Sequence, residues 1–237
     1  MLRIKKKGLD VKNRQEQEIT TIVRRVTDVL SAYRKQLLIT ASILAALLVI
    51  AGGYTIMRSA DERKAGPLIV AAYEFYSPSD LSTADYGKAL ELFRSIQKKY
   101  SRTMSAAIAQ YYIGNCLANL GQADEALKEY QVFIKTYSGE KFLLGLVYQR
   151  MGYLYGMLGK QTDAVKAFEQ SEILEGPGVA MVELARYYES SGNMPESQKK
   201  YKILQEKLSG TTWGIEAMGK VQVIKPASQP AVENEGK

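Results

Sequence analysis

Few side chains in this sequence could carry out chemistry. The chain has no histidine and a single cysteine, Cys116, so it lacks the usual base for nucleophilic catalysis and is poor in soft metal ligands. Cys116 follows Gly114 by two positions on an expected helix, where a small thiol in the core is the simpler interpretation. We therefore expect no catalytic residue, no metal site and no cofactor.

Two other patterns resemble reactive motifs, but a role in the local helical structure explains each of them better than a catalytic or ligand-binding role does. Gly159-Lys160 suggests a phosphate-binding loop, but Gln161 replaces the serine or threonine and Leu154 stands where the first glycine belongs. The adjacent acids Asp124-Glu125 lie at an expected helix start, where negative charge is favourable against the helix dipole. The sequence thus favours a binding protein over an enzyme.

The strongest single element is the run from Leu37 to Met57, LLITASILAALLVIAGGYTIM, which has no charged side chain. As a helix it would be roughly 31 Å long and would match a hydrocarbon core of about 30 Å. A cleaved secretory signal is the alternative, since Ala51-Gly52-Gly53 offers small residues, but this run and its leader are long for one. We expect residues 37–57 to form an uncleaved transmembrane helix that contacts the lipid bilayer.

The basic charge of the chain gathers before this run. Net charge is +7, and residues 1–36 hold ten Lys and Arg against four Asp and Glu, which gives +6. A nearly neutral remainder argues against nucleic acid as a partner, whereas a basic end before one span predicts a cytoplasmic N-terminus. Arg58, Arg63 and Lys64 follow the span, so the bias is modest. Residues 1–36 are expected to be a basic cytoplasmic arm.

The two ends of the chain carry weaker signals. Within residues 15–35, apolar side chains recur at steps of three and four, which predicts an amphipathic helix. They are Ile19, Ile22, Val23, Val26, Val29, Leu30 and Tyr33. This helix either continues into the span or lies on lipid headgroups, or it docks on a cytoplasmic partner. Residues 222–237 are polar with two prolines and predict a disordered tail.

Between these ends the sequence repeats itself. Segments 114–130, 152–168 and 185–201 align without gaps, at periods of 38 and 33 residues. Each has a small residue first, a glycine seven positions on, another small residue twelve on and an aromatic residue sixteen on. In order, these are Gly114, Gly152 and Ala185; Gly121, Gly159 and Gly192; Ala126, Ala164 and Ser197; Tyr130, Phe168 and Tyr201. A weaker copy with Ala89 and Phe93 precedes them.

This pattern predicts helical hairpins. A small first residue lets two antiparallel helices approach, a glycine suits the helix end where positive φ is needed, and we expect the aromatic rings to fill the gap to the next hairpin. One hairpin cannot bury its apolar faces alone, so several must stack. We expect an all-α fold, with about four hairpins over residues 58–221 and a terminal helix in which Trp213, Ile215 and Met218 cover the last hairpin.

The spacing resembles the tetratricopeptide repeat, whose ideal period is about 34 residues, over residues 67–210. Gln110, Tyr148 and Met181 replace the early tryptophan of that repeat, and its closing proline is absent or displaced. The resemblance implies a concave groove, lined by the first helix of each hairpin, for protein partners or unfolded peptide segments. The implied groove residues are Tyr111, Asn115, Asn119, Gln149, Tyr153, Met157, Val182, Arg186 and Glu189.

The order of a basic arm, one span and hairpin repeats is similar to the bacterial ancillary subunit of the Sec translocon, the YfgM-like family. That resemblance implies a single-pass protein of the bacterial inner membrane, with its repeats in the periplasm beside translocon subunits or periplasmic chaperones. A scaffold of another envelope assembly, such as a secretion, pilus, cytochrome-maturation or division apparatus, is the alternative. The groove residues do not separate the two.

Overall fold

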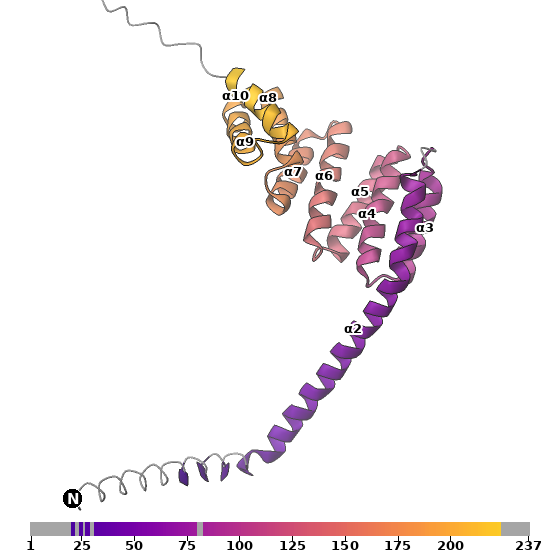
Figure 1. The fold of residues 1–237 in the computed structure, drawn as a ribbon, viewed down its shortest axis with the longest axis vertical. Coiled ribbons are helices and arrows are strands. Elements are labelled where there is room, and N and C mark those ends of the chain that lie inside the picture. The colour runs from indigo at the N-terminus through magenta and orange to yellow at the C-terminus, as the bar shows by residue number, and fades with distance from the viewer. Residues whose placement is uncertain (1–19, 22–23, 26, 29–30, 80–82, 224–237) are drawn as a thin grey trace, which may run out of the picture. The chain divides into compact units, whose positions relative to one another are not determined.

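The computed structural model describes residues 20–21, 24–25, 27–28, 31–79 and 83–223, and every regular element in them is a helix (Figure 1). The predicted all-α fold class is therefore confirmed. The predicted arm and the apolar stripe on it lie mostly outside the described residues, and so does the predicted tail after Val223.

The helices follow one another with short connections. Their bounds are Arg34–Tyr76 for α2, Tyr86–Lys99 for α3, Met104–Asn119 for α4, Ala123–Thr136 for α5, Lys141–Met157 for α6, Gln161–Glu175 for α7, Val179–Ser190 for α8, Met194–Lys207 for α9 and Thr212–Val223 for α10. The chain divides into two compact units, Met1–Arg58 and Ser59–Lys237, and α2 runs from the first into the second.

Helix α2 contains the whole predicted span and continues to Tyr76 without a break. Its apolar side chains over residues 37–57 are exposed, as Val49 at 75% illustrates, whereas its buried residues Ala65 and Ala72 come later. By length and composition this helix could cross a membrane. A long apolar surface of this kind is unfavourable in water, and a bilayer is the solvent that suits it.

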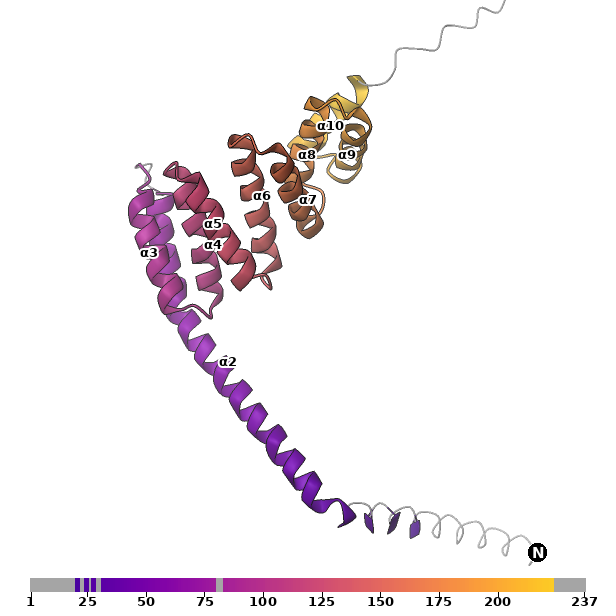
Figure 2. The same cartoon turned by 180° about the vertical axis from the view of Figure 1, so that it is seen from behind.

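The second unit is a row of helical hairpins in chain order (Figure 2). The end of α2 meets the start of α3, where the amide of Asp85 donates to the carbonyl of Phe75 at 2.8 Å and the rings of Tyr76 and Tyr86 are 5.5 Å apart. After this first hairpin, α4 pairs with α5, α6 with α7 and α8 with α9; α3 also packs on α4, and α10 packs on α9. Glu62 ties the first hairpin to the second, because its carboxylate accepts hydrogen bonds from the Met104 and Ser105 amides and the Ser105 hydroxyl. The predicted solenoid of helical hairpins is therefore confirmed, and α10 follows its last described hairpin.

The small residues of the repeat sit where helices meet. A methyl group at Gly114 would lie within 2.7 Å of three ring atoms of Tyr130, and one at Gly152 would lie 2.7 Å from Cε1 of Phe168. The expected close approach is therefore confirmed. The rings pack over the glycine of their own hairpin, because antiparallel helices bring these two positions face to face. They also face the next hairpin, as expected: Phe168 shares a buried cluster with residues of α8, and Tyr130 lines a cavity with residues of α6.

The glycines expected at the helix ends do adopt positive φ. Gly121, Gly159 and Gly192 have φ values of 78°, 72° and 78°. At the first of these ends, the amide of Gln122 donates to the carbonyl of Leu117 at 2.9 Å, which satisfies a carbonyl that the helix leaves open. The α4–α5, α6–α7 and α8–α9 hairpins therefore turn at a residue without a Cβ, in the conformation that glycine adopts most easily.

The terminal helix α10 covers the last hairpin with different residues from those expected. Ile215 and Met218 are 60% and 43% exposed, and Trp213 is 37% exposed, so none of the three is buried. The buried contacts come from Ala217, which joins a cluster with α8 and α9, and from Gly214, where a Cβ would overlap the carbonyl of Leu208. Small residues on this face let α10 lie close against the hairpin. The helix also extends past 221, into the predicted tail.

Candidate peptide-binding groove

The predicted groove residues on α4 are mostly built into the core. Tyr111 and Asn115 are 7% and 3% exposed, whereas Asn119 is exposed. The Asn115 Oδ1 accepts a hydrogen bond of 2.6 Å from the buried hydroxyl of Tyr130, and the Asn119 amide donates to the Asn115 carbonyl at 2.9 Å. Asn115 therefore has a fixed orientation, set by the same aromatic ring that packs over Gly114.

A cavity of about 220 Å³ opens beside these asparagines, and we call it the donor cavity. Its walls combine hydrogen-bonding side chains with apolar ones. They are Tyr76, Asn115, Ala118, Asn119, Tyr130, Arg150, Tyr153, Leu154 and Met157. Arg150 brings the only formal charge among these lining residues, and its Nε donates to the hydroxyl of Tyr111 at 3.4 Å.

Two of the three groove residues predicted on α6 border a second, larger space of about 570 Å³, which we call the aromatic cavity. Tyr153 and Met157 line both cavities, and Met157 is 80% exposed. The rings of Phe168 and Tyr187 complete the apolar lining. Burial raises the pKa of Tyr153 above its ordinary value, which keeps its hydroxyl protonated and able to donate to Glu183 at 3.3 Å.

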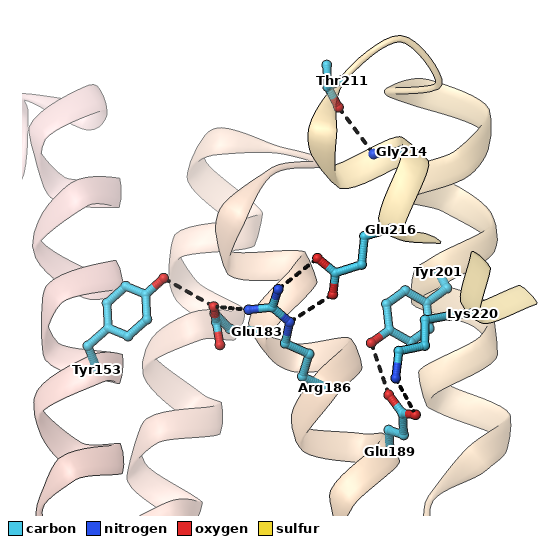
Figure 3. Close-up of polar contacts among 9 residues, drawn as sticks. All are labelled: Tyr153, Glu183, Arg186, Glu189, Tyr201, Thr211, Gly214, Glu216 and Lys220. Carbon is cyan, nitrogen blue, oxygen red and sulfur yellow. Dashed lines mark hydrogen bonds and ion pairs between the residues drawn. The ribbon is translucent and has the colours of Figure 1, made fainter. Parts of the chain in front are cut away.

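The groove residues on α8 are engaged by α10 (Figure 3). Arg186 donates two hydrogen bonds of 2.9 and 2.7 Å to the Glu216 carboxylate and a third, of 3.0 Å, to Glu183. Glu189 accepts from Lys220 at 2.7 Å, and that hydrogen bond lowers the pKa of its carboxyl. Arg186 and Glu189 are therefore already paired with side chains of α10, which leaves them few hydrogen bonds to offer a partner.

The structure brings together five of the nine predicted groove residues around the two cavities. They are Asn115, Asn119, Tyr153, Met157 and Arg186. Tyr111 and Val182 are buried, so they support the groove from inside, and Glu189 is paired with α10. Gln149 is half-buried and lines neither cavity. Whether a partner touches any of these residues stays a prediction.

Sequence reasoning missed Arg150, Tyr76 and Tyr187 in the cavity walls. Arg150 lies three positions before Tyr153, and residues three apart share a helix face, so its charge could have been assigned to the groove. Tyr76 is the last residue of α2, outside the aligned repeats, and no spacing pointed to it. The one thiol stays in the core: Cys116 is fully buried, and burial raises its pKa to about 12.

Known proteins share this repeat architecture. Residues 108–139, in α4, α5 and their flanks, match the family model described as tetratricopeptide repeat. The chain is similar to the crystal structure of a tetratricopeptide repeat protein from Parabacteroides merdae, at 15% identity and a TM-score of 0.54 over 68% of this chain and 59% of that one. A search of curated proteins finds no match.

A second solved structure has the same fold. It is a putative kinesin light chain from Podosopora anserina with nearly identical TPR-like repeats, at 15% identity and a TM-score of 0.51 over 67% of this chain and 83% of that one. At such identities the likeness shows the fold alone. The second unit is thus a tetratricopeptide-like solenoid, and the chain spans little more than half the length of the Parabacteroides structure.

Proposed function

We propose that the chain is a membrane-anchored protein-interaction module whose solenoid binds extended segments of other proteins. The observation that carries this proposal is the aromatic cavity, where Tyr153, Met157 and Tyr187 offer apolar surface beside polar side chains. Ligand sites typically combine a largely apolar lining with a few polar groups that orient the ligand. Tetratricopeptide-type hairpins are well suited to this task because stacking leaves a continuous surface along their first helices.

The anchor in this proposal is the apolar part of α2, residues 37–57. The excess of basic residues in 1–36 supports a cytoplasmic N-terminus, which would put the solenoid in the periplasm of a bacterial cell. Tethering would hold the groove at the membrane surface, where its effective concentration for segments that emerge there is high.

The partner that we favour is the Sec translocon, with periplasmic chaperones as recipients of the captured segments. The support is the similarity in layout to the YfgM-like family. A scaffold for a secretion, pilus, cytochrome-maturation or division assembly is the alternative, and it would use the same groove. We propose binding rather than catalysis in either case, since the buried thiol of Cys116 has a raised pKa and no histidine to activate it.

Site-specific photo-crosslinking in intact cells tests this proposal. A crosslinking amino acid at Met157, which is exposed and lines both cavities, is expected to capture translocon subunits or periplasmic chaperones. The same group at Glu125, which is exposed on α5 and lines neither cavity, is the matched control. Capture of another envelope assembly from Met157 would favour the alternative. Equal capture from both sites would contradict use of the groove.

The orientation needs its own measurement. A topology reporter fused after Lys237 is expected to show activity outside the cytoplasm. Activity in the cytoplasm would refute the periplasmic assignment while leaving the groove itself untouched.

A further inference from the structure

The first two hairpins differ in charge between their two ends. At the end where α3 and α5 finish and α6 begins, seven exposed basic side chains gather, and we call this the basic end. They are Arg63, Lys64, Lys98, Lys99, Arg102, Lys135 and Lys141. The acids there, Asp61, Glu62 and Glu140, are fewer and half-buried. At the opposite end, the described charged side chains closest to the turns are acidic: Glu74, Asp85, Asp124 and Glu125.

Hydrogen bonds hold the segments of the basic end together. The Glu62 carboxylate accepts from the Met104 amide at 2.7 Å, so the α3–α4 loop, which carries Arg102, lies beside α2. The hydroxyl of Tyr137, the residue after α5, donates to the Ser101 carbonyl at 3.1 Å, so the α5–α6 turn meets the same loop. Basic side chains that are far apart in the sequence thus come together at one end of the solenoid.

The helix dipole explains only part of this charge. Lys98, Lys99 and Lys135 lie in the last turns of α3 and α5, where a positive charge is favourable. Arg102 lies in a loop, however, and Lys141 begins α6, where a positive charge is unfavourable. Within the described part of the chain, none of the seven basic side chains forms an ion pair with a carboxylate. The basic end is therefore suited to an anionic partner from outside the chain.

The basic end follows closely after the predicted membrane span. Glu62 comes five positions after Met57, the last residue of that span, on the same helix α2. Five helical residues rise about 7.5 Å, which is roughly the depth of the polar headgroup layer of a bilayer. Phe142, next to Lys141, is 72% exposed, and an apolar ring among basic side chains is typical of surfaces that rest on lipid headgroups. The nearest anions are therefore the phosphate groups of the lipids themselves.

We propose that the basic end binds the headgroups of anionic phospholipids and holds the first two hairpins against the membrane surface. The ligand chemistry is a phosphate group within a lipid headgroup, contacted by lysine and arginine side chains. This proposal rests on the membrane anchor of the proposed function but not on the use of the groove. The anchor alone ties one helix to the bilayer, whereas contacts at the basic end decide which end of the hairpins faces the lipid.

Fluorescence quenching in lipid nanodiscs tests this proposal with the full chain. The fluorophore is attached to Ser101→Cys, because Ser101 is exposed in the α3–α4 loop and the natural thiol of Cys116 is buried. The nanodiscs contain phosphatidylcholine alone or mixed with phosphatidylglycerol, and both kinds carry the same fraction of lipid with a nitroxide on its headgroup. We expect about threefold stronger quenching in the anionic nanodiscs, and this difference should shrink as salt is raised.

Matched variants assign the effect to the basic end. Lys99→Glu combined with Arg102→Glu should abolish the difference between the two kinds of nanodisc. The control combines Lys128→Glu with Lys160→Glu, which are exposed toward the opposite end, and should keep the difference. Both variants change the net charge equally, so a general charge effect would appear in both. The basic arm does not contribute, because the fluorophore reports on the α3–α4 loop alone.

Each other outcome overturns a defined claim. Equal quenching in the two kinds of nanodisc would overturn the assignment to lipid and favour an acidic protein as the partner of the basic end. Loss of the difference when inorganic phosphate is added at constant ionic strength would overturn it in favour of a free anion. A difference that survives charge reversal at Lys99 and Arg102 would overturn the role of the basic end. A chain that elutes apart from the nanodiscs would overturn the anchor, and with it the proposed function.

Discussion

Substitution of Gly114 by alanine tests how tightly the second hairpin is built. The added methyl group would lie within 2.7 Å of three ring atoms of Tyr130. Carbon atoms pack at about 3.5–4.0 Å, so the ring or the helix would have to move by about 1 Å. Tyr130 is fully buried and its hydroxyl is held by Asn115 at 2.6 Å, so it has little room to move.

The expected destabilisation follows from opposing terms. Overpacking a core costs about 1–3 kcal/mol, loss of the hydrogen bond between Tyr130 and Asn115 adds about 1 kcal/mol, and the better helix propensity of alanine returns about 1 kcal/mol. The Gly114→Ala variant should therefore be less stable by about 2 kcal/mol, which lowers the Tm by about 5 °C in a domain of this size. Thermal unfolding of the full chain in detergent, followed by circular dichroism, measures this change.

The chain supplies a matched control for this experiment. A methyl group at Gly156, on helix α6, would meet no atom within 4 Å. Gly156→Ala should therefore keep or raise the Tm, because only the helix-propensity term remains. Adding Tyr130→Leu to the Gly114→Ala variant should make the two effects less than additive, since the clash is then removed. Equal Tm values for Gly114→Ala and Gly156→Ala would refute the close-packing explanation.

Three further outcomes follow from contacts elsewhere in the second unit. Burial raises the pKa of the Glu175 carboxyl, so its charged form opposes folding at neutral pH. Glu175→Gln should therefore raise the free energy of unfolding by no more than about 0.5 kcal/mol. This gain should disappear as the pH falls through the raised pKa, because the carboxyl is then neutral in the folded chain as well. Arg186→Gln removes the ion pair with Glu216, so amide hydrogen exchange in α10 should become about fivefold faster, whereas the exchange rates in α4 should not change. Cys116 should resist alkylation at neutral pH until denaturant exposes it, and labelling of the folded chain would contradict its burial.

The repeat architecture could be predicted because its determinants are local. A glycine that needs positive φ and a small residue where helices cross leave a periodic signal, and the structure confirms it at Gly121, Gly159 and Gly192. The position of the aromatic rings was also within reach. Gly114 and Tyr130 are equally far from the turn at residue 122, as are Gly152 and Phe168 from residue 160, and antiparallel helices pair such positions.

The cavities were less predictable because they depend on contacts between hairpins. The repeat alignment indicates which positions face the groove, but not which of them the next helix will cover. Val182 was assigned to the groove and is 3% exposed, whereas Arg150 was not assigned and lines the donor cavity. Burial at such positions is set by side chains some 30 to 40 residues away, as the hydrogen bond from Tyr153 to Glu183 illustrates.

The terminal helix decides how much of the groove face can bind a partner. Glu183 accepts a hydrogen bond from the Tyr153 hydroxyl of the preceding hairpin. Arg186 donates both to Glu183 and to Glu216 of α10. Helix α10 thus continues the series of contacts between hairpins. Because these side chains are already satisfied, a partner gains little from them. In the donor cavity, the Nδ2 of Asn115 has no hydrogen-bond partner and Arg150 has no carboxylate partner among the described residues. Both side chains line this cavity together with the exposed Met157, so binding should be centred on the second and third hairpins.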